Sequence, residues 1–133
     1  MNGAVPAELK LLGIAVVIGL VQLVWATAAA GREQARGWLL GPRDEARPLG
    51  VMAGRLERAF RNFMETFPLF AAAVIVANLT GKLGALTLWG SGLYVAARAL
   101  YAPLYASGIP VARTLVWMIG SIGLLLVVLA LFR

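Results

Sequence analysis

The sequence predicts an all-α membrane protein, a single domain (residues 1–133) folded as a four-transmembrane-helix bundle. Three observations predict this class. The chain of 133 residues is 61% hydrophobic and 14% charged, whereas an average globular domain has about 45–50% apolar residues. The apolar residues form long stretches, and a helix needs about 20 of them to cross a bilayer. The arginines concentrate beside these stretches, as signals of membrane topology do.

The first span is expected at residues 9–30. Nearly all residues from 11 to 30 are apolar or small, with Gln22 as the most polar exception. A cleaved signal peptide is the alternative, but it would begin with a positively charged region. Glu8 and Lys10 make a poor region of that kind, so we expect an uncleaved helix.

The second span is expected at residues 55–79. Its uninterrupted apolar run, residues 67–79, is too short to cross a bilayer. The helix must therefore begin near Arg55 or Arg58 and carry polar residues to membrane depth. Pro68 lies inside this helix and is expected to bend it, because proline cannot donate the helical hydrogen bond.

Two short turns define the remaining spans. The turn at residues 80–82 is brief, so the second span and the third, at residues 83–105, should form an antiparallel hairpin. Small residues, a glycine and a proline at residues 106–110 predict the next turn. The fourth span follows at residues 111–132.

Lysine and arginine are distributed unequally between the two sides of this bundle. The side with the first and third connections carries Arg32, Arg36, Arg43, Arg47, Arg55, Arg58, Arg61, Arg98 and Arg113. The opposite side has only Lys10, Lys82 and Arg133. Basic residues beside spans are retained in the cytoplasm, so the termini are expected outside and the first and third connections inside. This pattern accounts for the net charge of +6 without a nucleic-acid partner.

The residue types available for chemistry are few. The sequence has no cysteine and no histidine, which excludes a thiolate metal site, a cysteine nucleophile and an imidazole proton shuttle. Arginine, tyrosine and carboxylates remain. No metal cofactor is expected, and any thiol must arrive with a substrate.

Two polar stripes lie at membrane depth. The stripe on the second span falls within an arc of about 100° and consists of Arg58, Arg61, Asn62 and Glu65. The stripe on the third falls within about 60° and consists of Tyr94, Arg98, Tyr101 and Tyr105. An ionisable group in a span is costly unless it is paired or faces a cavity, so the stripes indicate a site inside the bundle. The alternatives are arginines that extend to the interface and tyrosines that form an interfacial belt.

The charge of these residues indicates a class of ligand. Several arginines with one carboxylate and one amide suit a small molecule that has two carboxylates and an ammonium group. Glutathione has this charge pattern and also a thiol, whose ionised form an arginine would favour. Other zwitterionic or anionic ligands fit the same groups.

Two spaced motifs contain the stripes. The first is Glu-Arg-Ala-Phe-Arg-Asn-Phe-Met-Glu-Thr-Phe-Pro-Leu-Phe at residues 57–70, and the second is Arg-Ala-Leu-Tyr-Ala-Pro-Leu-Tyr at residues 98–105, followed by Arg113. They resemble the MAPEG family, the membrane-associated proteins in eicosanoid and glutathione metabolism. The matches cover residues 43–117. The Gly-Pro-Arg-Asp-Glu loop at residues 41–45 is similar to a bacterial branch, which implies the bacterial inner membrane.

The resemblance implies a homotrimer with glutathione between neighbouring protomers near the cytoplasmic side. The residues implied to contact glutathione are Arg58, Asn62, Glu65, Arg98, Tyr101, Tyr105 and the first-loop Arg43. Among them, Arg58 and Asn62 would hold backbone and carboxylate groups and Glu65 the γ-glutamyl amine. Arg113 would be the catalytic residue that activates the thiolate.

The resulting hypothesis is a membrane glutathione transferase, with peroxidase activity left open, that acts on a lipophilic electrophile from the bilayer. Its partners would be glutathione, a lipophilic small molecule or lipid, and membrane lipids. Thr66 stands where the leukotriene-synthase branch of the family has a tyrosine, so the second substrate is not defined. The alternatives are a non-catalytic lipid-binding or scaffolding relative and, from another class, a small transporter or channel.

Overall fold

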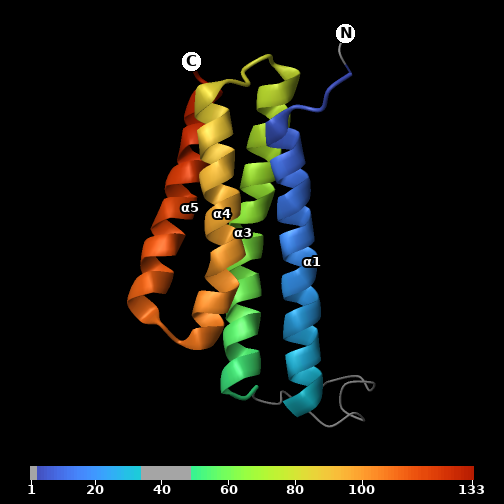
Figure 1. Ribbon diagram of the computed structural model, residues 1–133, viewed down its shortest axis with the longest axis vertical. Coiled ribbons are helices and arrows are strands. Elements are labelled where there is room, and N and C mark those ends of the chain that lie inside the picture. The colour runs from blue at the N-terminus through green and yellow to red at the C-terminus, as the bar shows by residue number, and fades with distance from the viewer. Residues whose placement is uncertain (1–2, 34–48) are drawn as a thin grey trace.

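The structure is a computed structural model that describes residues 3–33 and 49–133. The described residues form four helices: α1 (Ala7–Glu33), α3 (Val51–Leu79), α4 (Ala85–Ser107) and α5 (Pro110–Ala130). The helices run side by side along the long axis of the molecule, and both termini lie at the same end (Figure 1). The prediction of an all-α four-helix bundle is confirmed.

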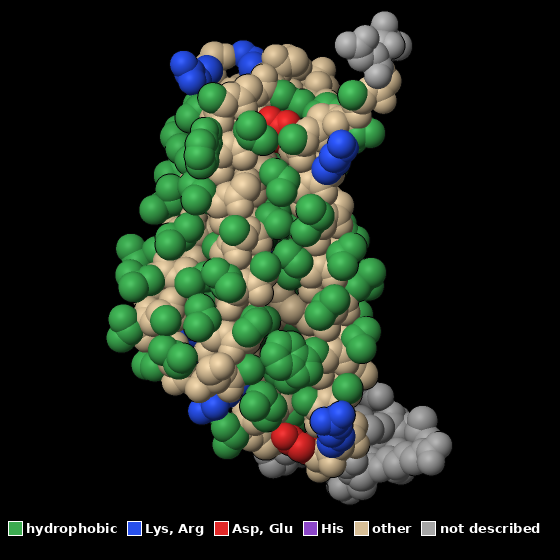
Figure 2. Space-filling model, in the orientation of Figure 1, with side chains coloured by type: hydrophobic (Ala, Val, Ile, Leu, Met, Phe, Trp, Pro, Cys, Tyr) green, Lys and Arg blue, Asp and Glu red, His purple; other side chains and the backbone are tan. Residues whose placement is uncertain are grey.

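The surface of the bundle is that of a membrane protein. Hydrophobic side chains cover the middle of the molecule, whereas charged side chains gather at its two ends (Figure 2). Among the described residues, α1, α3 and α5 are each long and apolar enough to cross a membrane. Helix α4 has the necessary length, 23 residues, but its inward face carries tyrosines and Arg98, which lower its hydropathy.

Helix α4 is the central element of the bundle. It contacts α1, α3 and α5, whereas α1 and α5 lie on opposite sides of the molecule (Figure 1). Its tightest partner is α5, and glycines make this close approach possible. A Cβ atom built on Gly123 would lie 2.5 Å from the carbonyl oxygen of Gly90 and 2.7 Å from the backbone nitrogen of Tyr94. Only glycine allows the two backbones to come so close.

Helix α3 begins at Val51, a turn earlier than the expected start at residue 55. The cause is a cap from another helix, because the Glu33 carboxylate at the end of α1 accepts hydrogen bonds from two backbone N–H groups. Gly50 donates to Oε2 at 2.6 Å and Ala53 donates to Oε1 at 3.4 Å. An acidic group at a helix N-terminus satisfies unpaired N–H groups and is favoured by the helix dipole. Helix α3 then continues through Pro68.

The end of the bundle that carries the termini has its own buried polar pair. Thr87 on α4 is fully buried and donates a hydrogen bond of 2.7 Å to the carboxylate of Glu8 on α1. One to two turns farther along α4, Tyr94 stacks on Phe70 with ring centroids 4.1 Å apart. These contacts close the bundle at this end and form part of its main core.

Candidate functional site

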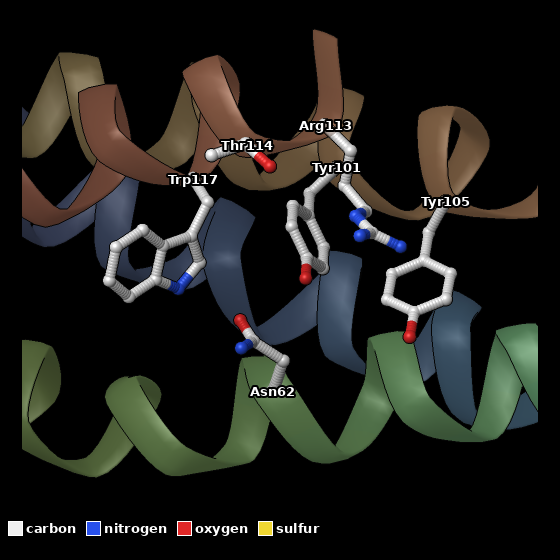
Figure 3. A pocket seen from close by; sticks show the side chains of 6 residues that line it. All are labelled: Asn62, Tyr101, Tyr105, Arg113, Thr114 and Trp117. Carbon is white, nitrogen blue, oxygen red and sulfur yellow. The ribbon is translucent and has the colours of Figure 1, made fainter. Parts of the chain in front are cut away.

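A pocket opens at the other end of the bundle, where α5 separates from α4. The two helices lie close near the glycine contact and are farther apart near the turn at residues 108–109 (Figure 1). The pocket has a volume of about 240 Å³ and lies between α3, α4 and α5. The residues that line it are Asn62, Tyr101, Tyr105, Arg113, Thr114 and Trp117 (Figure 3).

Arg113 provides the positive charge of the pocket. Pro110 starts α5, because its fixed backbone angle suits the first helical position and it lacks only an N–H that would be unpaired there. Arg113 follows in the first turn, and its guanidinium carbon lies 4.5 Å from the centre of the Tyr105 ring. In Figure 3 its side chain extends into the space between Tyr101 and Tyr105. This places a cation over an aromatic face and toward the pocket.

Tyr105 connects Arg113 on α5 to Arg58 of the polar stripe on α3. Its hydroxyl oxygen accepts a hydrogen bond of 2.9 Å from Nε of the exposed Arg58 on α3. The Tyr105 O–H group therefore keeps its own proton free to donate to a ligand. Tyr101 lies edge-on to Tyr105, with ring centroids 5.7 Å apart, so both rings form one wall of the pocket.

Asn62 is oriented by a buried arginine. Arg98 is only 2% exposed, and its Nη1 donates to the side-chain oxygen of Asn62 at 2.6 Å. The Arg98 guanidinium lies 5.2 Å from the centre of the Tyr101 ring. Because the oxygen of Asn62 is engaged, its NH₂ group is the part that can donate to a ligand. Arg98 itself does not line the pocket and reaches it only through Asn62 and Tyr101.

Other predicted or neighbouring polar residues lie outside this pocket. Glu65 is exposed on α3 and is not among the lining residues. Arg61 pairs with Glu57 on the surface of the same helix at 3.0 Å. Tyr94 is turned into the core, where its hydroxyl shares a hydrogen bond of 2.9 Å with Thr66. Arg43 lies outside the described residues.

Two lining residues, Thr114 and Trp117, were not predicted. Both lie on α5 within one turn of Arg113, so their spacing from Arg113 was the available signal. This spacing alone did not predict a site. No polar stripe on the fourth span supported it, and tryptophan is common near a membrane interface without any role in binding. Their place in the site depends on which face α5 presents to α3.

The pocket end carries an excess of positive charge. Within the described residues the only ion pair is Arg61 with Glu57, so Arg58, Arg98 and Arg113 have no carboxylate partner there. The same residues contain no cluster of histidine, cysteine or carboxylate side chains that could hold a metal ion. Uncompensated arginines with amide and hydroxyl donors form a site suited to an organic anion.

The fold and the site together define a class: a small membrane protein whose helices enclose a pocket at one end that is lined by an arginine and two tyrosines. The sequence matches the profile of the MAPEG family over residues 11–133. The match covers nearly the whole chain, and the chain belongs to the MAPEG family. No curated protein and no solved structure shows a significant match to it.

Proposed function

We propose that this protein is a membrane-bound glutathione transferase. One observation carries the proposal: Arg113 faces a pocket with tyrosine and amide donors and has no carboxylate partner among the described residues. An arginine in that setting stabilises a thiolate over a thiol, whose unperturbed pKa is about 8.5. Membership of a family associated with glutathione metabolism supports the same substrate.

Each polar group has a defined part in the proposed complex. The exposed Arg58 binds a carboxylate of glutathione, together with Arg43 of the first loop. The NH₂ group of Asn62 and the hydroxyl groups of Tyr101 and Tyr105 donate to peptide carbonyl oxygens. Glu65, three residues after Asn62 on α3, binds the ammonium group. Arg98 supports this set from behind by orienting Asn62.

The reaction needs only the thiolate and an electrophile. The thiol proton leaves to solvent, and Arg113 stabilises the sulfur anion electrostatically. The thiolate then attacks an electrophilic carbon, forms a C–S bond and expels the leaving group with its bonding electrons. A second hollow of about 280 Å³ lies between α3 and α5 and is lined only by apolar side chains, which suit the apolar part of a lipophilic electrophile. Leu69 and Leu124 lie there, about two turns along α3 and α5 from Asn62 and Trp117.

We also propose that three copies assemble and that the arginine-rich end faces the cytoplasm of a bacterial cell, in its inner membrane. Large apolar side chains of α1 are exposed, including Val17 at 58% and Val24 at 65%. Glu65 is exposed on α3, where a neighbouring protomer would complete the site. Native mass spectrometry in mild detergent should give the mass of a trimer, and a monomer alone would contradict this assembly.

The decisive variant is Arg113→Ala. Without the guanidinium, the pKa of the bound glutathione thiol rises, so the pH–rate profile moves to higher pH. Removal of one electrostatic stabiliser in an active site lowers turnover by about 100-fold or more, while glutathione affinity changes much less. The ultraviolet absorbance of the thiolate is recorded during a pH titration with glutathione bound, and conjugation to a model aryl halide gives the rate.

Arg61→Ala is the matched control, because Arg61 lies at the same end of the molecule but pairs with Glu57 outside the pocket. Its thiolate titration should resemble that of the parent. Identical titrations for Arg113→Ala and the parent would exclude the catalytic assignment. Glutathione binding without a thiolate in the parent itself would favour the non-catalytic lipid-binding alternative.

A further inference from the structure

A further hollow lies between α1 and α4, separate from the pocket that contains Arg113 and from the apolar hollow between α3 and α5. We call it the α1–α4 groove. Its volume is about 170 Å³ and its exposed lining is almost wholly apolar. The residues that line it are Val17, Ile18, Val21, Gln22, Trp25, Arg98, Ala99, Ala102 and Pro103.

Gln22 is the one amide in this lining. Its side chain is 4% exposed, and neither its oxygen nor its nitrogen has a hydrogen-bond partner within residues 3–33 and 49–133. A buried amide is costly when both of its polar atoms are unpaired, and more so at membrane depth, where water is scarce. An apolar residue at this position would remove that cost, so the amide indicates a polar partner beyond residues 3–33 and 49–133.

Helix α4 adds to the same groove a backbone acceptor that lacks its usual helical donor. In a regular helix the carbonyl oxygen of Ala99 accepts a hydrogen bond from the backbone N–H of residue 103. Residue 103 is Pro103, which has no N–H. Ala99 and Pro103 both line the groove. Arg98 also lines the groove, and its Nε and Nη2 have no hydrogen-bond partner among the described residues. The groove thus combines these donors and the amide of Gln22 with a backbone acceptor, a set that suits a hydroxyl group, which donates one hydrogen bond and accepts others.

The size and walls of the groove define the rest of the ligand. An apolar cavity of about 150 Å³ is known to hold benzene, so a groove of about 170 Å³ has room for one ring. Trp25 lies three residues after Gln22 on the same face of α1 and supplies an aromatic wall. Aromatic rings pack favourably against such a surface.

We propose that the α1–α4 groove binds a monocyclic phenol that enters from the bilayer, with its ring against Trp25 and its hydroxyl group on Gln22 and the Ala99 carbonyl. The groove shares only Arg98 with the residues assigned to glutathione, and Nη1 of Arg98 is directed to Asn62 on α3. The inference is therefore independent of the proposed transferase activity.

The test uses two probes that differ by one hydroxyl group, para-bromophenol and bromobenzene. The bromine atom quenches tryptophan fluorescence, so the protein carries Trp25 as its only tryptophan, with Trp38, Trp89 and Trp117 changed to Phe. We expect saturable quenching by both probes, with para-bromophenol binding about five-fold more tightly, as one neutral hydrogen bond provides. Each comparison is made at one detergent concentration, so that partition of a given probe is the same for the parent and its variants.

Two variants separate the parts of the proposal. Gln22→Leu removes an unpaired amide and keeps the volume, so it should fold and should bring the two affinities to about the same value. Ala99→Leu fills the groove and should weaken both probes at least several-fold. Quenching that rises linearly and equally for both probes would show partition into the micelle only and would overturn the proposal. So would saturable but equal affinities in the parent, or a preference for the phenol that survives in Gln22→Leu.

Glutathione-dependent thiolate formation is measured in parallel on the parent and on variants that keep all four tryptophans, because Trp117 lines the pocket of Arg113. It should be unchanged by Gln22→Leu and Ala99→Leu, because neither residue lines the pocket of Arg113. Absence of phenol binding with normal thiolate formation would contradict only the proposal for the α1–α4 groove. Absence of thiolate in every protein would contradict only the proposed transferase activity.

Discussion

The two halves of α4 carry polar side chains at the same spacing but use them differently. In the half near the chain termini, Thr87 binds Glu8 and Tyr94 binds Thr66, and both α4 residues are fully buried. In the other half, Arg98 binds Asn62, while Tyr101 and Tyr105 line a pocket. The first half is a closed structural core and the second is open to a ligand.

The distance between α4 and α5 explains this difference. Near the termini Gly90 and Gly123 allow backbone contact, so no space remains between α4 and α5 for a ligand. Toward the turn at residues 108–109 the helices separate, and Arg113 and Trp117 border the resulting space (Figure 1). A polar stripe on a membrane helix therefore indicates burial inside the bundle, but the packing of the next helix decides between a paired core and a binding site.

The largest effect is expected from Gly123→Ala, which would force the closed half apart. The added Cβ would meet backbone atoms of Gly90 and Tyr94 at 2.5 and 2.7 Å, and backbone cannot move aside as a flexible side chain can. Overpacking of this kind costs about 2–3 kcal/mol. Unfolding by SDS in mixed micelles measures the change.

The control is Gly92→Ala on the partner helix α4, where an added Cβ meets nothing within 4 Å. It should be neutral or stabilising by up to about 1 kcal/mol, because alanine is the better helix former. Equal stability of the Gly123→Ala variant and the parent would show that the glycine contact does not hold the closed half together.

Asn62→Leu tests the open half. The change leaves the buried Nη1 of Arg98 without its acceptor, and an unpaired buried group of this kind costs about 2–3 kcal/mol. The same denaturation assay applies. Asn78→Leu makes the same change on α3 at a half-buried position and should have a smaller effect. If the two variants unfold alike, the Arg98–Asn62 bond contributes little to the fold.

Glu65→Gln separates a ligand role from a structural one. Because Glu65 is exposed in the protomer, the variant should fold as the parent does. Its affinity for glutathione should fall by about 1.5–3 kcal/mol, the range for a hydrogen bond to a charged group. Isothermal titration calorimetry measures this change, with Glu57→Gln, whose carboxylate pairs with Arg61, as the control. Unchanged affinity would remove Glu65 from the proposed site.

The smallest effect is expected from Thr66→Val, which removes the partner of the Tyr94 hydroxyl. One neutral hydrogen bond contributes about 1 kcal/mol, so stability should fall by that amount and glutathione binding should not change. Thr27→Val on the exposed face of α1 is the control. A loss of glutathione affinity in Thr66→Val would mean that the closed half takes part in binding after all.

The sequence by itself determined the fold class and much of the composition of the site. Long apolar stretches separated by short polar turns predict helices, because both signals are local in the chain. The turn at residues 80–82 and the helix start at Pro110 follow from the same local rules. The spacing of Asn62, Tyr101 and Tyr105 placed each of them on the inward face of its helix, and the structure brings these three residues to one pocket.

Only the tertiary structure decided which inward residues meet. Arg98 and Tyr101 share one stripe, yet Arg98 is held behind Asn62 and Tyr101 lines the pocket. The early start of α3 depends on Glu33, a residue of another helix. The spacing of residues along one helix fixes the direction of each side chain relative to its own axis. The rotation and distance of the neighbouring helices depend on contacts between residues distant in the chain, such as Gly90 with Gly123. These contacts determine what each side chain faces.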